Sequence, residues 1–296
     1  MKNRNIAVLI STYNGEKYLE ALLDSVLNSK KVDFDIIVRD DGSKDKTHLI
    51  LEDYSKKYKN IKVYYGKNLG YAKSFWELIK LAGDYEYYAF CDQDDIWLEN
   101  KLFKAIEKIE EIENKISVLY TSRVVSVDNN MNVLSENTFP NDKALNVYES
   151  FQKSVVPGCT FVFNKESAEI LKQFDGNMES HDWAAYTIIS VFGKVIYDNN
   201  SYIKYRIHDS NAIGQDSRLG QLKIKVSRFF QKRKNTRSKF AQAFYASYKN
   251  KIPEKYKNDI AYLAFYRESF KYKIKLLFSN KFKGIIFKIY VILNRV

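Results

Sequence analysis

Three acidic side chains fall within four residues, directly after an apolar run. Tyr87 to Cys91 is apolar and aromatic, which predicts a buried strand, and Asp92, Asp94 and Asp95 follow it. Because strands disfavour Asp, the acids are expected to mark the strand's carboxyl end. Carboxylates this close repel one another unless a proton or a cation neutralises them, and a hard divalent ion shared with substrate phosphates would do so. The alternative is a solvated acidic turn that caps the next helix.

A second acidic turn favours the ligand site. Strand 35–38 runs into Asp40, Asp41 and Gly42. Over the first 115 residues, apolar runs at 6–11, 35–38, 61–65 and 87–91 alternate with helical patterns such as 16–29 and 71–81. This alternation predicts a parallel, doubly wound sheet, in which ligands bind at the carboxyl edge of the strands. Two acidic turns on one edge can share one ligand, whereas independent surface turns have no reason to converge.

Composition limits the classes of protein. The chain has 296 residues, 45% of them hydrophobic, and a formal charge of +12, which calls for a membrane surface, a nucleotide or a nucleic acid as partner. Cys91 and Cys159 lie in separate apolar stretches without metal spacing, which favours a reduced, cytosolic protein. The polar start does not resemble a signal peptide, and no window reaches the ~20 apolar residues of a membrane span.

The pattern changes after residue 116. A hairpin is expected over 117–134, a strand over 159–163, an apolar helix from about 181 to 191, and two strands at 195–197 and 202–207. From about residue 219 the chain reads as helical and very basic, and 272–296 contains no acid. This end either lies in a membrane interface, with Lys against anionic lipid heads, or packs on the protein with its basic face in water.

Several motifs in register carry a resemblance to a known family. They are Val8 to Asn14, Val38 to Ser43, Asn68 to Gly70, Cys91 to Asp95, and the segments Pro157 to Thr160, His181 to Trp183 and Tyr205 to His208. Together they resemble family 2 glycosyltransferases of the GT-A fold, in the branch that includes bacterial rhamnosyltransferases. The resemblance covers roughly residues 5 to 215. It implies a Rossmann-like α/β fold, a mostly parallel sheet flanked by helices, in a domain 1–215. Residues 1–115 would bind the nucleotide-sugar and 116–215 the acceptor, and 216–296 would form a basic helical extension.

The resemblance also assigns the donor and metal residues. Thr12 and Tyr13 would line the nucleotide base, and Asp41 would accept a hydrogen bond from the pyrimidine N3–H, a task suited to an ionised, acceptor-only carboxylate. Asp94 would ligate Mn²⁺ or Mg²⁺. Asp92 would reach the ribose or the waters of the metal.

The remaining assignments keep their alternatives. Asp182 matches the family's catalytic base, and a role as a helix N-cap is the alternative. His181 stands where the family more commonly has Glu, which leaves its role beside Asp182 open. Trp183 stacks on an acceptor sugar or belongs to the core. Asp95 supports the site or caps a helix, and His208 completes the metal site, contacts the diphosphate or is structural.

The sequence therefore predicts an inverting, metal-dependent glycosyltransferase. Rhamnose carried by dTDP would be moved to a surface polysaccharide on a lipid carrier, and the enzyme would be cytoplasmic and peripheral at the inner face of the plasma membrane. Nucleic acid is not an expected partner, and homo-oligomer formation is left open. One alternative is a sugar-phosphate nucleotidyltransferase, although the Gly-rich basic loop expected after its first strand is missing. The other is a non-enzymatic basic protein that binds membranes or nucleic acid, which leaves the acids at the strand ends unexplained.

Overall fold

A computed structural model describes residues 5–112, 116–136, 144–153, 156–208 and 235–296. The chain forms two compact units. The first contains Met1–Ala144, Ser154–Lys172 and Ser180–Arg206, and the second contains Leu145–Lys153, Gln173–Glu179 and Ile207–Val296. The second unit thus includes two short segments that precede the basic end of the chain. The boundary predicted between residues 215 and 216 lies outside the described residues.

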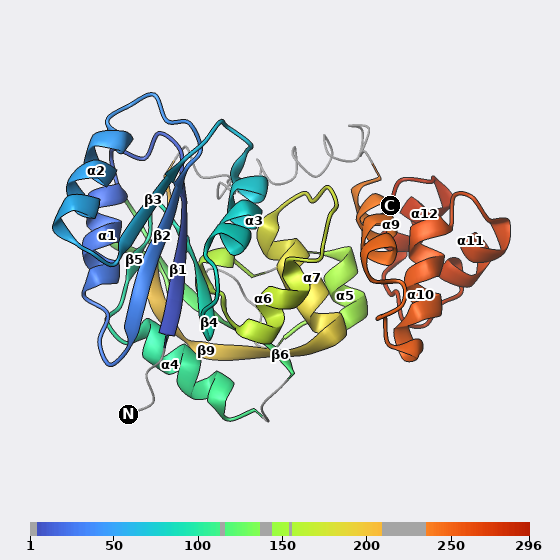
Figure 1. The fold of residues 1–296 in the computed structure, drawn as a ribbon. Coiled ribbons are helices and arrows are strands. Elements are labelled where there is room, and N and C mark those ends of the chain that lie inside the picture. Colours follow the sequence, from blue (N-terminus) through green and yellow to red (C-terminus); the bar gives the residue numbers. More distant parts are fainter. Residues whose placement is uncertain (1–4, 113–115, 137–143, 154–155, 209–234) are drawn as a thin grey trace. The chain divides into compact units, whose positions relative to one another are not determined.

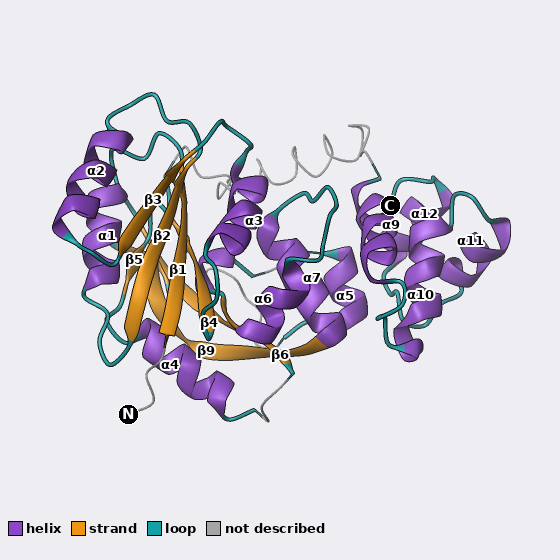
Figure 2. Cartoon of the chain, viewed as in Figure 1, coloured by secondary structure: helices purple, strands orange, loops and turns teal. Residues whose placement is uncertain are grey.

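The first unit is built on one mixed sheet (Figure 2). Its strands are β1 (Asn5–Thr12), β2 (Asp33–Asp40), β3 (Ile61–Tyr65), β4 (Tyr87–Asp92), β5 (Ile96–Trp97), β6 (Ser117–Val127), β7 (Val133–Ser135), β8 (Val162–Asn164) and β9 (Gly193–Arg206). Their order is β3-β2-β1-β4-β8-β6-β9-β5, and β7 pairs with β6. The first four neighbours run parallel, whereas β8 is antiparallel to both β4 and β6. The carboxyl ends of β1, β2 and β4 therefore meet at one edge.

Helices cover both faces of the parallel part. They are α1 (Leu19–Leu27), α2 (Thr47–Lys57), α3 (Tyr71–Leu81), α4 (Lys101–Glu110), α6 (Lys165–Leu171) and α7 (His181–Phe192), with a 3₁₀ turn η1 at Gly158–Thr160. Figure 1 shows α1 and α2 on one side of the strands and α3 on the other. Residues Ile6 to Ile10 of β1 are all fully buried, as expected for a central strand covered on both faces.

The α/β class with a parallel first half is confirmed, and local details differ. The strand predicted over 159–163 is instead η1 followed by a short β8, because the Thr160 hydroxyl and the Phe161 N–H donate to the carbonyls of Pro157 and Gly158 and close a turn. The two strands predicted after residue 194 form one irregular strand, β9, whose register against β6 shifts near Arg123. The helix predicted over 16–29 is shorter, since α1 begins only at Leu19 and ends at Leu27.

The second unit is helical, as predicted for the basic end of the chain. It contains α5 (Val147–Gln152), α9 (Thr236–Tyr248), α10 (Glu254–Phe265), α11 (Phe270–Leu277) and α12 (Ile285–Ile292). Its core is aromatic: Phe151, Phe174, Phe240, Phe244 and Tyr248 are buried and in mutual ring contact. Among the described helices of the chain, none has the length and apolar composition that a membrane span requires.

Candidate active site

The acidic stretch lies where the sequence predicts it, at the carboxyl end of a central strand. Asp92 is the last residue of β4, and Asp95 lies in the tight link to β5 and is fully buried. Ligand atoms of Asp92, Asp95 and Cys159, the last from η1, all lie within 4.8 Å of one another. One carboxylate oxygen of Asp95, Oδ2, has no hydrogen-bond partner among the described residues. The alternative of a solvated, helix-capping turn does not fit these buried groups.

The electrostatics of the cluster favour binding of a cation. Although part of the Asp92 side chain reaches solvent, burial by the surrounding protein and the carboxylates of Asp94 and Asp182 raise its pKa to about 8. Burial, followed by the charges of Asp94 and Asp92, raises the pKa of Asp95 well above its usual range. Each of these acids lowers its own energy by gaining a proton or a positive neighbour. The donor set is hard oxygen with one thiol, which suits a divalent ion held through carboxylates.

Asp182 belongs to the same electrostatic cluster although it is distant in sequence. It lies in the first turn of α7 and is 8% exposed. The N-cap of that helix is Ser180, and Asp182 Oδ1 accepts a hydrogen bond from the Trp183 N–H at 2.6 Å. Its carboxylate raises the pKa of Asp92, so the fold brings the two acids near each other. Asp182 is therefore not the N-cap residue of α7, although its carboxylate accepts from one N–H of the first turn.

His181 lies next to Asp182, with its ring buried against aromatic side chains. Its ring is 4% exposed and stacks on Phe75, with 3.9 Å between ring centroids. Neither ring nitrogen has a hydrogen-bond partner in the described part of the chain, and burial lowers the pKa of the imidazole to about 4. A Cβ at Gly158 would lie 2.8 Å from His181 Nε2 and 2.8 Å from Asp182 Cβ. Glycine at this position therefore lets η1 approach the start of α7.

The end of β1 is linked to the acidic stretch through Gln93. Gln93 Oε1 accepts hydrogen bonds from the Thr12 hydroxyl at 2.7 Å and from the Tyr13 N–H at 2.9 Å, and Gln93 Nε2 donates to the Tyr13 carbonyl. Thr12 is buried, whereas Tyr13 is 41% exposed. A Cβ at Gly15 would lie 2.7 Å from Gln93 Oε1. Sequence reasoning missed Gln93, and its place between two acids was the signal for it.

Asp41 is buried and shapes a loop. Its carboxylate pairs with Arg39 and accepts hydrogen bonds from the N–H groups of Leu69 and Gly70, at 2.8 and 2.9 Å. Three donors already use most of the acceptor capacity of a carboxylate. The side chain therefore fixes the loop 68–70, and its predicted contact with a pyrimidine remains a prediction.

Lys101 is a buried cation that sequence reasoning also missed. It is 1% exposed, and its Nζ lies 3.4 Å from the centroid of the Trp97 ring, with no hydrogen-bond partner among the described residues. Burial lowers its pKa to about 8, against the opposing charges of the nearby acids and thiols. The signal was helical spacing, since Lys101 stands four and eight residues before the buried Ala105 and Ile109. Lys101 is thus a positive group close to Asp92 and Asp95.

The structure also gives the positions of Trp183, Arg206 and His208. Trp183 is 2% exposed and belongs to the core, the second of its two predicted alternatives. Arg206, the last residue of β9, donates from Nε to the Asp94 carbonyl at 3.0 Å and so holds the acidic link. His208 is half-buried, two residues after β9, in the second unit. Its predicted part in a metal site remains a prediction.

The class of protein follows from comparison with known proteins. Residues 7–171 match the family model "Glycosyl transferase family 2", which spans more than half of the chain. The chain belongs to this family and is a glycosyltransferase, which sets aside the nucleotidyltransferase and the non-enzymatic alternatives.

A particular relative gives a finer comparison. The chain is 31% identical over 218 residues to the "dTDP-rhamnosyl transferase RfbG" of Shigella flexneri, over 69% of this chain and 73% of that protein. Other curated relatives are matched over 64% of their own length. The resemblance to family 2 glycosyltransferases, including their rhamnosyltransferases, is thereby confirmed.

Solved structures share the fold. TarS 1–349 of S. aureus in complex with UDP-GlcNAc has a TM-score of 0.60 at 19% identity, over 93% of this chain and 76% of that one. The mannosyltransferase PcManGT from Pyrobaculum calidifontis, in complex with GDP-Man and Mn²⁺, has a TM-score of 0.56 at 15% identity, over 92% of this chain and 71% of that one. The predicted GT-A class of fold is confirmed.

Proposed function

We propose that this glycosyltransferase moves rhamnose from dTDP-rhamnose to a hydroxyl of a growing, lipid-linked surface polysaccharide, with inversion at the anomeric carbon. The observation that carries the proposal is the position of Asp182. It is a nearly buried carboxylate in the first turn of α7, close enough to raise the pKa of Asp92 at the end of β4. The sugar and its nucleotide rest on the similarity to the Shigella protein, whose name states them.

Asp182 is the proposed general base. As the acceptor oxygen attacks the anomeric carbon, its proton passes to the Asp182 carboxylate. The new carbon–oxygen bond forms while the bond from that carbon to the phosphate oxygen breaks, and the nucleoside diphosphate leaves with the bonding electrons. One displacement from the opposite face inverts the configuration, by the geometric argument that applies to inverting glycosidases. His181 is neutral near pH 7 and supports the helix start on which Asp182 lies.

The donor is proposed to lie along the edge formed by β1, β2 and β4. The exposed ring of Tyr13 would line the base, and Gln93, which accepts a hydrogen bond from the Thr12 hydroxyl, accepts another from the Tyr13 N–H. Asp41 keeps loop 68–70 in place through two N–H groups and supplies its remaining acceptor site to the pyrimidine. Asp92 is proposed to contact the ribose or water bound to a metal.

A divalent ion, Mn²⁺ or Mg²⁺, fits the acidic cluster. Asp94 is proposed to hold the ion next to the group formed by Asp92, Asp95 and Cys159, whose ligand atoms lie within 4.8 Å of one another. The partnerless Oδ2 of Asp95 supports a cation at that group. His208 remains a proposed further ligand. When bound, the ion neutralises charge on the diphosphate of the donor as it departs. The protein's own part is to hold the carboxylates in place, through Arg206 at the acidic link.

Calorimetric titration with a panel of nucleotide-sugars, each with and without Mn²⁺ or Mg²⁺, tests this function. We expect metal-dependent binding of dTDP-rhamnose that Asp94→Ala abolishes together with turnover. Asp84→Ala is the matched control, because Asp84 is an exposed acid that pairs with Lys165 in the same unit. Binding of a different nucleotide-sugar would show that rhamnose is not the sugar transferred. Failure of all donors to bind to a folded protein, as judged by circular dichroism, would contradict the donor site.

The proposed location of the enzyme is the inner face of the plasma membrane. A lipid-linked acceptor is presented there, and the +12 charge of the chain favours an anionic surface. Transfer to an acceptor in vesicles, compared with transfer to the same glycan freed from its lipid, measures whether the lipid matters. Equal rates on both would contradict a membrane-bound acceptor.

A further inference from the structure

The last two helices expose apolar side chains to an unusual degree. Phe270 on α11 and Phe278, the residue directly after that helix, are each 80% exposed, and on α12 Ile285 and Ile286 are 78% and 64% exposed. Ile292 and Leu293 are 57% and 48% exposed. These six residues are called the docking face. Large apolar side chains gathered on one surface mark a place where something apolar binds, whereas single exposed ones need no explanation.

The exposed residues follow helical spacing, so they form stripes rather than scattered points. Phe270 and Ile274 stand four residues apart on α11, and the exposed Ile285, Ile289 and Ile292 stand four and three residues apart on α12. Such spacing places residues on one side of a helix. Leu276 and Val291, from the same two helices, are fully buried and hold the helices in the second unit. The helices therefore have two apolar sides, one packed and one open.

The charged side chains that the last two helices themselves carry are all positive. Residues 269–296 contain no Asp or Glu, and Lys271, Lys275 and Lys283 are exposed and form no ion pair within the described part of the chain. Two other lysines are used structurally: Lys288 Nζ donates to the Leu276 and Ser279 carbonyls, both at 2.9 Å, and Lys273 Nζ donates to the Ile292 carbonyl at 3.0 Å. The partner of this surface therefore carries negative charge.

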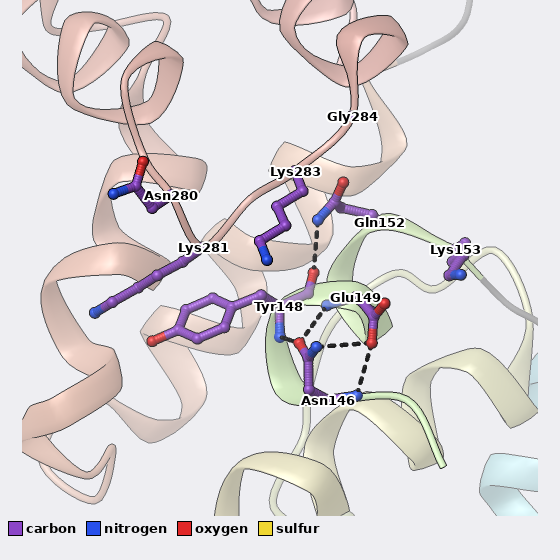
Figure 3. A pocket seen from close by; sticks show the side chains of 9 residues that line it. All are labelled: Asn146, Tyr148, Glu149, Gln152, Lys153, Asn280, Lys281, Lys283 and Gly284. Atoms are coloured by element: carbon purple, nitrogen blue, oxygen red, sulfur yellow. Dashed lines mark hydrogen bonds between the residues drawn. The ribbon is translucent and has the colours of Figure 1, made fainter. Parts of the chain in front are cut away.

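A polar pocket of about 480 Å³ adjoins the loop between the two helices. Figure 3 shows Lys283 pointing from this loop toward Tyr148 and Glu149, whereas the Lys281 side chain runs past Tyr148; Gln152 and Lys153 line the pocket on the α5 side. The Glu149 carboxylate that also lines it is occupied, because it accepts hydrogen bonds from the backbone and side chain of Asn146. Lys281 is paired with Asp259. Lys153 and Lys283 thus supply positive charge suited to a phosphate.

We infer that the docking face binds an anionic phospholipid bilayer, with the apolar side chains in the acyl region and lipid phosphates at Lys271, Lys275 and Lys283. A bilayer offers an apolar phase and negative charge together. A second copy of the chain would bring the same positive charge against this face, and a nucleic acid would leave the apolar stripes in water. The inference gives the proposed membrane location its contact surface and is tested without donor or acceptor, so its outcome is independent of the transfer reaction.

Flotation of the full chain with vesicles tests the inference. Vesicles of phosphatidylcholine with phosphatidylglycerol should bind the chain, and vesicles of phosphatidylcholine alone should bind it much less. Phe278→Ser with Ile285→Ser should weaken binding at least about tenfold. Lys271→Gln with Lys275→Gln and Lys283→Gln should weaken it on the order of a hundredfold, and less at high salt.

Matched controls lie in the first unit. Leu49→Ser with Val133→Ser replaces two exposed apolar residues, and Lys57→Gln with Lys59→Gln and Lys194→Gln replaces three exposed lysines. Neither control should change vesicle binding. Equal loss in the control and docking-face variants would overturn the inference. So would sedimentation velocity that shows concentration-dependent self-association removed by Phe278→Ser, together with no binding to anionic vesicles.

Discussion

The two units depart from ordinary burial in opposite directions. At the edge of the sheet, the first unit buries Asp95 and Lys101 almost completely and leaves atoms of both without hydrogen-bond partners among the described residues. The second unit does the reverse, because Phe270 and Ile285 are 80% and 78% exposed on the short helices α11 and α12. Buried polar groups without partners cost free energy, and so does apolar surface left in water.

Each departure points to the kind of partner that would remove its cost. Partnerless carboxylates with raised pKa values are satisfied by a cation or by polar groups of a substrate. An exposed apolar surface is satisfied by an apolar phase. Places where a fold buries polar groups without partners or exposes large apolar side chains are expected to be functional sites, because such departures from ordinary burial are uncommon elsewhere in a fold. The predictions below test each departure, in order of decreasing effect.

Asp182→Asn should have the largest effect. It keeps the shape of the side chain but removes its ability to take a proton, so transfer should fall about 10²–10⁴-fold. Donor affinity should stay within a few-fold of the parent, measured by calorimetry beside a steady-state assay. Asp198→Asn is a control for acid removal elsewhere in the unit, where Asp198 accepts a hydrogen bond from the Tyr120 hydroxyl. Near-normal transfer by Asp182→Asn would show that another group is the base.

His181 should make the first unit sensitive to acid. The pKa of its imidazole is about 4 in the folded protein and about 6.5 when unfolded, so between these values the unfolded chain binds more protons. Stability contributed by the neutral ring is present above pH 6.5 and is lost as the pH falls toward 4, by about 3 kcal/mol in all. His181→Met, an apolar and adaptable replacement, should reduce this loss.

Urea unfolding at pH 7 and pH 4.5 measures the difference. His48→Met is the matched control, because His48 is exposed on α2. A pH dependence of unfolding that is unchanged in His181→Met would mean that the buried ring is not the group that titrates.

The residues of the candidate site show how much of the fold and of the site could be predicted from the sequence. Apolar runs that alternate with helical patterns predicted the parallel strands and placed Asp92 at a strand end, because period and turn chemistry are local properties. The convergence of Asp182 with Asp92, 90 positions apart in the chain, came from resemblance and not from pattern. The burial of Lys101 and the role of Gln93 depend on tertiary neighbours, which no local pattern records. Gly158 admits the approach of η1 only because the start of α7 lies opposite it.

Lys101→Met tests the buried cation beside the acids. The Lys101 ammonium lowers the pKa of Asp92, so its removal should raise that pKa further. Binding of Mn²⁺ requires ionised carboxylates, and the pH at which binding is half developed should therefore rise, on the order of one unit. Calorimetry across pH measures this midpoint. Lys104→Met, one turn along the same helix but partly exposed and paired with Glu107, should leave this midpoint unchanged. A midpoint that moves down would mean that Lys101 chiefly repels the ion.

The smallest expected effect is on the free energy of unfolding, and it compares the exposed and the buried side of α12. Ile285→Ala removes apolar atoms that are already in water, so the free energy of unfolding should change by no more than about 0.5 kcal/mol. Val291→Ala, six residues later and fully buried, should cost about 1–3 kcal/mol because it loses burial and leaves a cavity. Denaturant unfolding of both variants without lipid makes the comparison. If Ile285→Ala proved as costly as Val291→Ala, the exposed stripe would be part of a packed interface in solution, and its apolar surface would no longer call for a bilayer.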